Sequence, residues 1–264
     1  MPEKAFSSVG FFHFGKDHHD PMGALEAAID KSTLNLEDAL VVLPEGFSLG
    51  RYYEEDLPAD FDMSVLCKLA RTSEETHCAF VASVVVRSTP GMADPPFSTA
   101  YLVDGKSKIQ PLTRKALVDT TTASPKRKHP NYTPYDSLDS FPMVHRGLGL
   151  AVLICRDALD WDQHDRDLFT KFLDAFSKLE ARHHVMCIPA NTKMWFRGLT
   201  TGCKATNGMR WPDSTINIFA NSNREHFSFV SGNDGTILTP DVRGPLNHIE
   251  TVLLEKFAPS DPIR

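Results

Sequence analysis

Two side chains that can take part in covalent chemistry come directly after apolar runs typical of buried strands. Glu45 follows residues 41–44, and Cys155 follows residues 151–154. A thiol at a strand-to-helix turn is well placed for nucleophilic attack, because a helix start lowers its pKa and backbone N–H groups there can hold an oxyanion. A carboxylate at the carboxyl edge of a sheet lies where α/β proteins place their ligands. The alternatives at this point are a surface-loop acid for Glu45 and a buried core thiol for Cys155.

A third group of interest, Lys115, lies just after an expected hairpin, within residues 112–118. Nothing local distinguishes it from the other lysines nearby, and a lone lysine is usually a solvated surface residue. Its significance therefore depends on the elements that would bring it near Glu45 and Cys155.

The elements that must position these residues alternate along the chain. Apolar runs of strand length are followed by helical patterns, which predicts an α/β fold with a mixed sheet system and two inserted hairpins. Asp20 is the expected N-cap of the first helix. The interval 118–143 is rich in Thr, Ser, Pro and Asp, so we expect a long loop there, of the kind that often forms a lid or binding loop. We expect strands over residues 9–14, 39–43, 78–86, 148–155, 185–190, 215–220 and 249–254, helices over 21–31, 64–72 and 165–180, and hairpins over 99–110 and 227–238.

In combination these features resemble the nitrilase superfamily of carbon–nitrogen hydrolases. A strand ending in Pro-Glu, a hairpin followed by Arg-Lys-x-Leu-Val, and the run Gly-Leu-Ala-Val-Leu-Ile-Cys-Arg-Asp occur in this order, and residues 188–191, 220–223 and 231–235 also fit. The resemblance covers most of the chain. It implies a single carbon–nitrogen hydrolase domain over residues 1–264, with the four-layer α-β-β-α sandwich of the nitrilase type. It also implies a stand-alone hydrolase without a synthetase domain, and a homodimer or higher homo-oligomer.

The resemblance further implies a Glu-Lys-Cys triad made of Glu45, Lys115 and Cys155. Glu45 would take the proton of Cys155, and the thiolate would attack the carbonyl carbon of a small-molecule amide substrate. The Lys115 ammonium, together with the backbone N–H of Arg156, would stabilise the oxyanion. Protonated Glu45 would release the amine, and a water activated by Glu45 would cleave the thioester. This chemistry requires no metal and no organic cofactor.

The sequence departs from the family pattern between the lysine and the cysteine. Family members usually carry a second glutamate there, whereas this chain has no glutamate between Glu75 and Glu180. Asp136 or Asp139 could replace it, although each side chain is one methylene shorter. The stretch 193–213 also departs from the more regular helical segment of the family, so substrate preference does not transfer.

Candidate substrate-binding residues are those that would face the same edge as the cysteine or follow the first glutamate. A structural role in a loop is the alternative for each of them. They are Arg156, Asp136, Asn191, Thr192 and Trp195, with Phe47 and Tyr52 on similar grounds.

Composition limits the other classes of function. The net charge of 28 − 34 = −6 disfavours nucleic acid or an anionic membrane as a partner. No apolar run reaches the length of a membrane span, and no secretory signal is recognisable. The five cysteines form no Cys-x-x-Cys pair, which indicates reduced thiols and a cytoplasmic protein. The histidine pairs at 18–19 and 183–184 are poorly spaced for a metal, so we expect no metal site.

The leading hypothesis is an amidohydrolase that acts on a linear carboxamide or a carbamoyl amide. A nitrilase is the first alternative, but Cys155 is followed by Arg-Asp, whereas nitrilases typically have Trp-Glu. The second alternative is a binding or regulatory protein that kept the fold and lost catalysis. The missing second glutamate motivates it, and the three intact triad positions argue against it.

Overall fold

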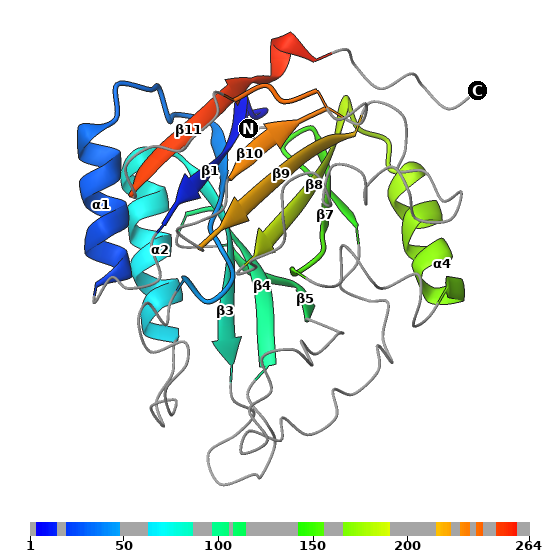
Figure 1. Ribbon diagram of the computed structural model, residues 1–264, viewed down its shortest axis with the longest axis horizontal. Helices are drawn as coiled ribbons and strands as arrows, with labels where there is room; N and C mark the ends of the chain where they lie inside the picture. The colour runs from blue at the N-terminus through cyan, green and yellow to red at the C-terminus, as the bar shows by residue number, and fades with distance from the viewer. Residues whose placement is uncertain are drawn as a thin grey trace, which may run out of the picture.

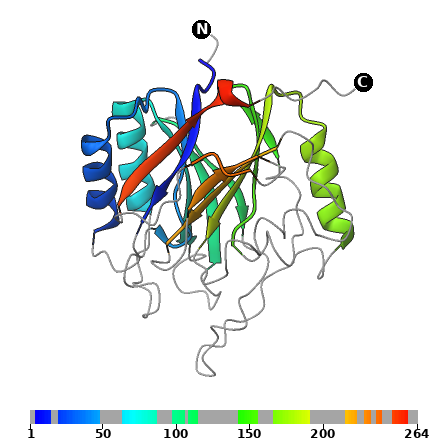
Figure 2. The same cartoon turned by 45° about the horizontal axis from the view of Figure 1, so that its top comes forward.

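Two β-sheets pack face to face, and helices cover their outer faces (Figure 1). This computed structural model describes residues 4–14, 20–47, 63–86, 97–105, 108–114, 142–155, 166–190, 215–222, 228–232, 236–239 and 247–257. Helices α1 (Pro21–Lys31) and α2 (Met63–Thr76) lie outside the first sheet, and α4 (Arg166–Ser177) lies outside the second. The expected four-layer α-β-β-α sandwich is confirmed, and Figure 2 shows the same layers from another direction.

The first sheet has the strand order β11-β1-β2-β3-β4-β5. Strands β1, β2 and β3 are parallel, with α1 and α2 as their crossovers. Strands β11 and β4 flank this trio in the antiparallel sense, and β5 pairs antiparallel with β4. The strands are β1 (Ser8–His13), β2 (Ala39–Val42), β3 (Ala79–Val86), β4 (Phe97–Val103), β5 (Ile109–Arg114) and β11 (His248–Leu253).

The second sheet repeats this plan with the order β10-β9-β8-β7-β6. Strands β7, β8 and β9 are parallel, and β6 and β10 flank them in the antiparallel sense. Helix α4 lies between β7 and β8 in the sequence. The strands are β6 (Met143–His145), β7 (Leu148–Val152), β8 (His183–Ala190), β9 (Ile216–Asn221) and β10 (Phe229–Ser231).

Strand β2 shows how one short run contributes to two cores. Successive side chains of a strand point to opposite faces of its sheet. Leu40 and Val42 pack in the core between the two sheets, whereas Ala39, Val41 and Leu43 pack in the core beneath α1 and α2. Both faces are covered, which explains why the strand is apolar throughout.

Helix α1 begins where the sequence predicts. Asp20 Oδ1 accepts a hydrogen bond from the Gly23 N–H at 2.9 Å, and Pro21 stands in the first turn, where no backbone donor is needed. Met22 and Leu25 are buried and turn the apolar face of the helix toward the first sheet.

The sequence analysis predicts the second strand of one hairpin and misses the first. Strand β6 begins at Met143, the end of the expected loop, and pairs with β7 through a turn at Arg146 and Gly147. Both turn residues have positive φ, 44° and 81°, as two-residue hairpin turns require. Asn or Asp is the usual residue at the first of these positions. With Arg146 there, the sequence lacks the Asn-Gly or Asp-Gly pair from which a hairpin would be predicted. Strand β7 also ends at Val152, before the predicted end at Cys155.

Candidate active site

The parallel strands of both sheets run toward the same end of the sandwich, the lower end in Figure 1. Glu45 comes three residues after the end of β2, and Cys155 comes three residues after the end of β7. The two reactive groups thus follow strands of facing sheets at one end of the molecule, which we call the carboxyl end. Ligands of α/β proteins bind at the carboxyl ends of parallel strands.

Glu45 is buried, with 2% of its surface exposed. A tight turn holds it, because Gly46 adopts a φ of 68° and the Phe47 N–H donates to the Pro44 carbonyl at 3.2 Å. Phe47 is fully buried, and its ring centroid lies 5.5 Å from that of Phe14 in the outer core. The surface-acid alternative for Glu45 is therefore wrong. The pocket role for Phe47 is also wrong, since its ring anchors this turn in the outer core.

Cys155 lies in a sharp turn that remains bonded to the second sheet. Beyond the end of β7, the Leu153 N–H donates to the Cys187 carbonyl at 3.0 Å, and the Cys155 N–H donates to the Pro189 carbonyl at 2.8 Å. Cys155 then adopts a φ of 51°, in the left-handed region that is costly for a residue with a side chain. Such backbone strain concentrates at functional sites, where the surrounding structure holds it in place.

The other described cysteines occupy ordinary structural positions. Cys78 and Cys187 are fully buried, and burial raises the pKa of both thiols well above the usual range, so they stay protonated. Cys67 is exposed on α2. Among the cysteines that the structure describes, Cys155 is the one that has a left-handed backbone at the carboxyl end.

Lys115 lies outside the described residues, but the strand that precedes it is described. Strand β5 ends at Arg114, which pairs with Thr99 of β4. Because β4 is antiparallel to β3, and β5 to β4, strand β5 runs in the same direction as the parallel trio. It also contacts β7 of the second sheet. The strand before Lys115 thus leads to the carboxyl end beside the strand that leads to Cys155.

The predicted substrate-binding residues lie outside the described part of the chain. Two of them come directly after the last residue of β8, and one directly follows Cys155 in the sequence. Their roles remain predictions. They are Arg156, Asp136, Asn191, Thr192 and Trp195, and the same holds for Tyr52 and Asp139.

A buried polar pair at the carboxyl end was missed by the sequence reasoning. His13 ends β1 and is 3% exposed, and its Nδ1 lies 3.0 Å from Oγ of Ser228, just before β10. The Ser228 hydroxyl also accepts the Asn221 N–H at 2.9 Å. Burial, reinforced by the neighbouring His248, lowers the pKa of His13 to about 4, so the ring is neutral near pH 7. The available signal was a histidine inside the apolar run 9–14.

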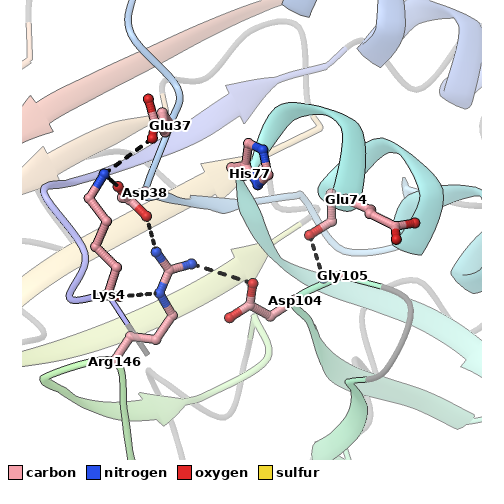
Figure 3. A pocket seen from close by; sticks show the side chains of 9 residues that line it. Lys4, Glu37, Asp38, Glu74, His77, Asp104, Gly105 and Arg146 are labelled. Atoms are coloured by element: carbon pink, nitrogen blue, oxygen red, sulfur yellow. Dashed lines mark hydrogen bonds and ion pairs between the residues drawn. The ribbon is translucent and has the colours of Figure 1, made fainter. Parts of the chain in front are cut away.

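A pocket of about 490 Å³ opens at the other end of the sandwich (Figure 3). Its lining includes Asp38, which directly precedes β2, whereas Glu45 follows that strand. The length of a strand therefore separates this pocket from the candidate active site. Figure 3 shows its central charged side chains turned toward one another: Lys4, Asp38, Arg146 and Asp104.

Arg146 is the centre of a charge cluster in that pocket. Its guanidinium contacts Asp38, donates to Asp104 Oδ1 at 3.4 Å and lies 4.4 Å from the centroid of the Phe6 ring. His145 Nε2 lies 2.6 Å from Asp104 Oδ2. Although burial opposes it, the hydrogen bond with His145 and the charge of Arg146 lower the pKa of Asp104. Arg146 and His145 come from the second sheet and both aspartates from the first, so this Arg146 cluster joins the sheets.

The described residues contain neither a cluster of metal ligands nor a helix that could cross a membrane. His183 and His184 open β8, and the His184 ring packs edge-on against Phe176 of α4, with 5.2 Å between the ring centroids. His184 is thus part of the packing between the second sheet and its helix.

Comparison with solved structures finds the same architecture in amidases. A cysteine-to-alanine mutant of the Nesterenkonia AN1 amidase from the nitrilase superfamily aligns over 96% of this chain and 92% of its own, with a TM-score of 0.60 and 16% identity. Another mutant of that amidase, showing Michael addition of acrylamide at its active-site cysteine, aligns over 93% and 92%, with a TM-score of 0.58 and 16% identity. A CN-hydrolase superfamily protein from Xanthomonas campestris, with an arsenic adduct in its active site, aligns over 94% and 89%, with a TM-score of 0.57 and 14% identity.

No protein-family model matches the sequence, and a comparison with curated proteins finds no match. At 14–16% identity, the structural similarity establishes the fold, which is the sandwich of the nitrilase superfamily. The activity must therefore be argued from the residues at the carboxyl end.

Proposed function

We propose that this protein hydrolyses a carbon–nitrogen bond of a small amide through a thioester on Cys155. The observation that carries the proposal is the placement of two buried groups at the carboxyl end. Glu45 follows a parallel strand of one sheet, and Cys155 follows a parallel strand of the facing sheet in a left-handed turn. A base and a nucleophile on facing elements are what acyl transfer through a thiol requires.

In the first half of the reaction, Glu45 takes the proton from the Cys155 thiol. The thiolate sulfur attacks the carbonyl carbon of the amide, and the carbonyl oxygen becomes an oxyanion. The Lys115 ammonium and the Arg156 backbone N–H stabilise that negative charge. Protonated Glu45 then gives its proton to the nitrogen, the carbon–nitrogen bond breaks, and ammonia or an amine leaves.

In the second half, Glu45 takes a proton from a water molecule, and the hydroxide attacks the thioester carbonyl. The carbon–sulfur bond breaks, the thiolate regains its proton from Glu45, and a carboxylic acid leaves. One carboxylate thus moves a proton in both halves of the cycle, with no redox change and no cofactor.

The alternative of a buried structural thiol is disfavoured by the backbone at Cys155. A packing cysteine gains nothing from a φ of 51°, and Cys187, a buried thiol inside β8, has no such conformation. The backbone of Cys155 itself still donates to β8, through the Pro189 carbonyl, and its left-handed φ departs from strand geometry there. This geometry suits presentation of the sulfur to a substrate.

The proposal is tested by incubating the protein with short carboxamides, carbamoyl amides and nitriles and measuring ammonia release. We expect release from at least one amide, and a loss of about a thousandfold or more in Cys155→Ala, because the nucleophile is gone. Glu45→Gln should lower the rate by about a hundredfold or more, since the amide cannot accept the proton. The intact mass of wild type, quenched in acid during turnover, should show a species heavier by the acyl group, and this species should be absent from Cys155→Ala.

Cys67→Ala is the matched control, since this thiol is exposed on α2, a helix that covers the outer face of the first sheet. It should retain wild-type turnover. Ammonia release that persists unchanged in Cys155→Ala would overturn the mechanism. Turnover of nitriles alone would favour the nitrilase alternative, and the absence of turnover on every compound would favour a non-catalytic binding protein.

A further inference from the structure

We infer that the buried pair His13–Ser228 is a positioning element that fixes the Cys155 turn relative to Glu45 across the two sheets. The inference rests on the proposed function, because it concerns the alignment of the base with the nucleophile. Neither His13 nor Ser228 is assigned contact with the substrate. Their role is to act through the strands that precede Glu45 and Cys155.

On the side of the first sheet, His13 is close in register to the glutamate turn. Strand β1 pairs in parallel with β2, and Phe11 lies opposite Val42. His13 ends β1 two residues after Phe11, and Glu45 comes three residues after Val42. The ring of Phe47 in the glutamate turn packs against Phe12 of β1 and Phe14 just after it, with centroids 6.0 Å and 5.5 Å apart, so a displacement of the end of β1 moves this turn.

On the side of the second sheet, a series of backbone hydrogen bonds leads from Cys155 to the serine. The Cys155 N–H donates to the Pro189 carbonyl at 2.8 Å, at the end of β8. The neighbouring Ala190 carbonyl accepts the Ser222 N–H at 3.1 Å, which ties β9 to β8. The Asn221 N–H then donates to Ser228 Oγ at 2.9 Å.

The contact between Ser228 Oγ and His13 Nδ1, at 3.0 Å, completes this path by crossing from one sheet to the other. Ser228 is 1% exposed and His13 is 3% exposed, so water does not replace either partner. The Ser228 hydroxyl accepts the Asn221 N–H, and its own proton has two acceptors within reach. These are the Asn221 carbonyl at 3.4 Å and, in the tautomer that leaves Nδ1 unprotonated, the closer ring nitrogen of His13 at 3.0 Å. Each polar group thus has a partner, as burial requires.

A hydrogen bond suits this role better than apolar contact does. Hydrophobic attraction has no preferred direction, whereas a buried hydrogen bond depends on both the distance and the direction between its two groups. At the opposite end, the Arg146 cluster joins the same two sheets. The His13–Ser228 pair fixes the sheets at the carboxyl end, where a misplacement of about 1 Å can cost about a hundredfold in rate.

The test compares two serine variants that lose the same kind of hydrogen bond. Ser228 accepts a backbone N–H at the carboxyl end, and Ser73, which is 2% exposed, accepts the Gly105 N–H at 2.8 Å at the opposite end. Ser228→Ala and Ser73→Ala should lower the stability to urea by similar amounts. We expect Ser228→Ala alone to lower kcat by about tenfold to a hundredfold, with KM within about threefold of wild type.

Conservative variants that keep the hydrogen bond distinguish a positioning role from a general loss of stability, because only a positioning role predicts that they restore kcat. Ser228→Thr keeps the hydroxyl and should restore kcat to within about threefold of wild type. His13→Phe replaces the imidazole by an aromatic ring without nitrogen and should lower kcat as Ser228→Ala does. His13→Asn keeps a polar atom near the position of Nδ1, so its kcat should fall less. If Ser228→Ala fails to fold by circular dichroism, the two His13 variants decide the question.

A second readout does not depend on turnover. The rate at which iodoacetamide alkylates Cys155, mapped by peptide mass spectrometry, should fall about fivefold or more in Ser228→Ala and stay within about twofold of wild type in Ser73→Ala. If no amide is turned over, the proposed function fails, yet this comparison still tests the inference. Equal alkylation rates in the two folded variants, or equal losses of kcat, would overturn it.

Discussion

At the scale of the residue, the buried cysteines of this protein differ in backbone conformation more than in burial. Cys155 and Cys187 both lie in the core between the sheets, and their backbones are joined through neighbouring residues of β8. Cys187 continues a strand, and burial raises the pKa of its thiol far above the usual range. Cys155 leaves its strand in a left-handed turn. The same side chain therefore serves packing at one position and is placed for chemistry at the other.

His13 should make the free energy of unfolding depend on pH. Burial, with the charge of His248, lowers the pKa of His13 from 6.5 to about 4 in the folded protein, whereas the unfolded chain keeps the ordinary value. Between these values the unfolded state binds more protons, so the free energy of unfolding falls as the pH drops from 6.5 toward 4. The shift corresponds to at most roughly 3 kcal/mol.

Urea unfolding of wild type and His13→Asn between about pH 7 and pH 4 measures this effect. The variant should lose less stability over that window, because it lacks the titrating ring. The difference between the two proteins isolates His13 from the remaining carboxylates and histidines. Parallel curves for the two proteins would contradict the assignment of the low pKa to this side chain.

The sequence predicted where single residues lie when a local pattern marks the end of a strand. Glu45 and Cys155 follow apolar runs, and both are found buried at the carboxyl end. The His13–Ser228 pair had no such pattern, because its members are 215 positions apart and meet only when the two sheets pack. Lys115 and the predicted substrate-binding residues lie outside the described residues, so these predictions stay untested.

At the scale of the element, strands and helices with covered faces were predictable, and so were the edge strands β10 and β11, but the short edge strand β6 was not. The apolar runs of β1, β2, β3, β8 and β9 gave their positions to within about two residues, as expected for buried parallel strands. Strand β6 has three residues and only one fully buried side chain, His145. Such a short edge strand is held by its pairing with β7, and its sequence shows almost no alternation of apolar and polar residues from which a strand could be predicted.

The pairing between β1 and β11 requires a residue without a side chain at position 10, which is Gly10. A Cβ at this position would overlap the backbone carbonyl of Glu250 and the backbone of Thr251. Gly10→Ala should therefore lower the free energy of unfolding by about 3 kcal/mol, because a paired backbone cannot move aside cheaply. Gly149→Ala is the control, since its Cβ would meet only side chains, at 3.1–3.2 Å.

Denaturation in urea, with both variants measured beside wild type, tests this difference. Gly149→Ala should cost about 1 kcal/mol, since flexible side chains can adjust by a few tenths of an ångström. A loss in Gly10→Ala no larger than that in Gly149→Ala would show that β11 accommodates the extra methyl group.

At the scale of the whole molecule, polar contacts join the two sheets near both ends of the sandwich. The His13–Ser228 pair lies at the carboxyl end, and the Arg146 cluster lies at the other. Between them the sheets meet through apolar side chains such as Leu40, Val81 and Ile218. The apolar side chains between the sheets stabilise the fold because they are buried there, and the polar contacts at the two ends fix how the sheets are aligned.

Arg146→Met should destabilise the fold and leave the reaction unchanged. The substitution removes the cation between Asp38 and Asp104, and loss of one partner of a buried ion pair costs roughly 3 kcal/mol or more. Because the cluster lies a strand's length from Glu45, kcat for an amide should stay within about threefold of wild type. Urea unfolding and steady-state kinetics on the same preparation give both values.

Lys178→Ala, which removes an exposed ion pair, is the control for Arg146→Met, which removes a buried one. Lys178 pairs with Asp174 at 2.6 Å, with both side chains more than half exposed, and such pairs contribute little. Its loss should leave stability and kcat at wild-type values. A fall of kcat in Arg146→Met as large as that in Ser228→Ala would show that the two ends of the sandwich are coupled.

The place of β11 has a consequence for how the chain is made. The strands of the first sheet arise in the first half of the sequence, except that β11, near the end, returns to pair with β1. During synthesis on the ribosome, β1 therefore keeps one row of backbone N–H and C=O groups open until β11 has emerged. An open edge of this kind is a template for pairing with other chains. The nascent protein thus passes through a long interval, from the synthesis of β1 to that of β11, in which the open edge of β1 carries a risk of aggregation.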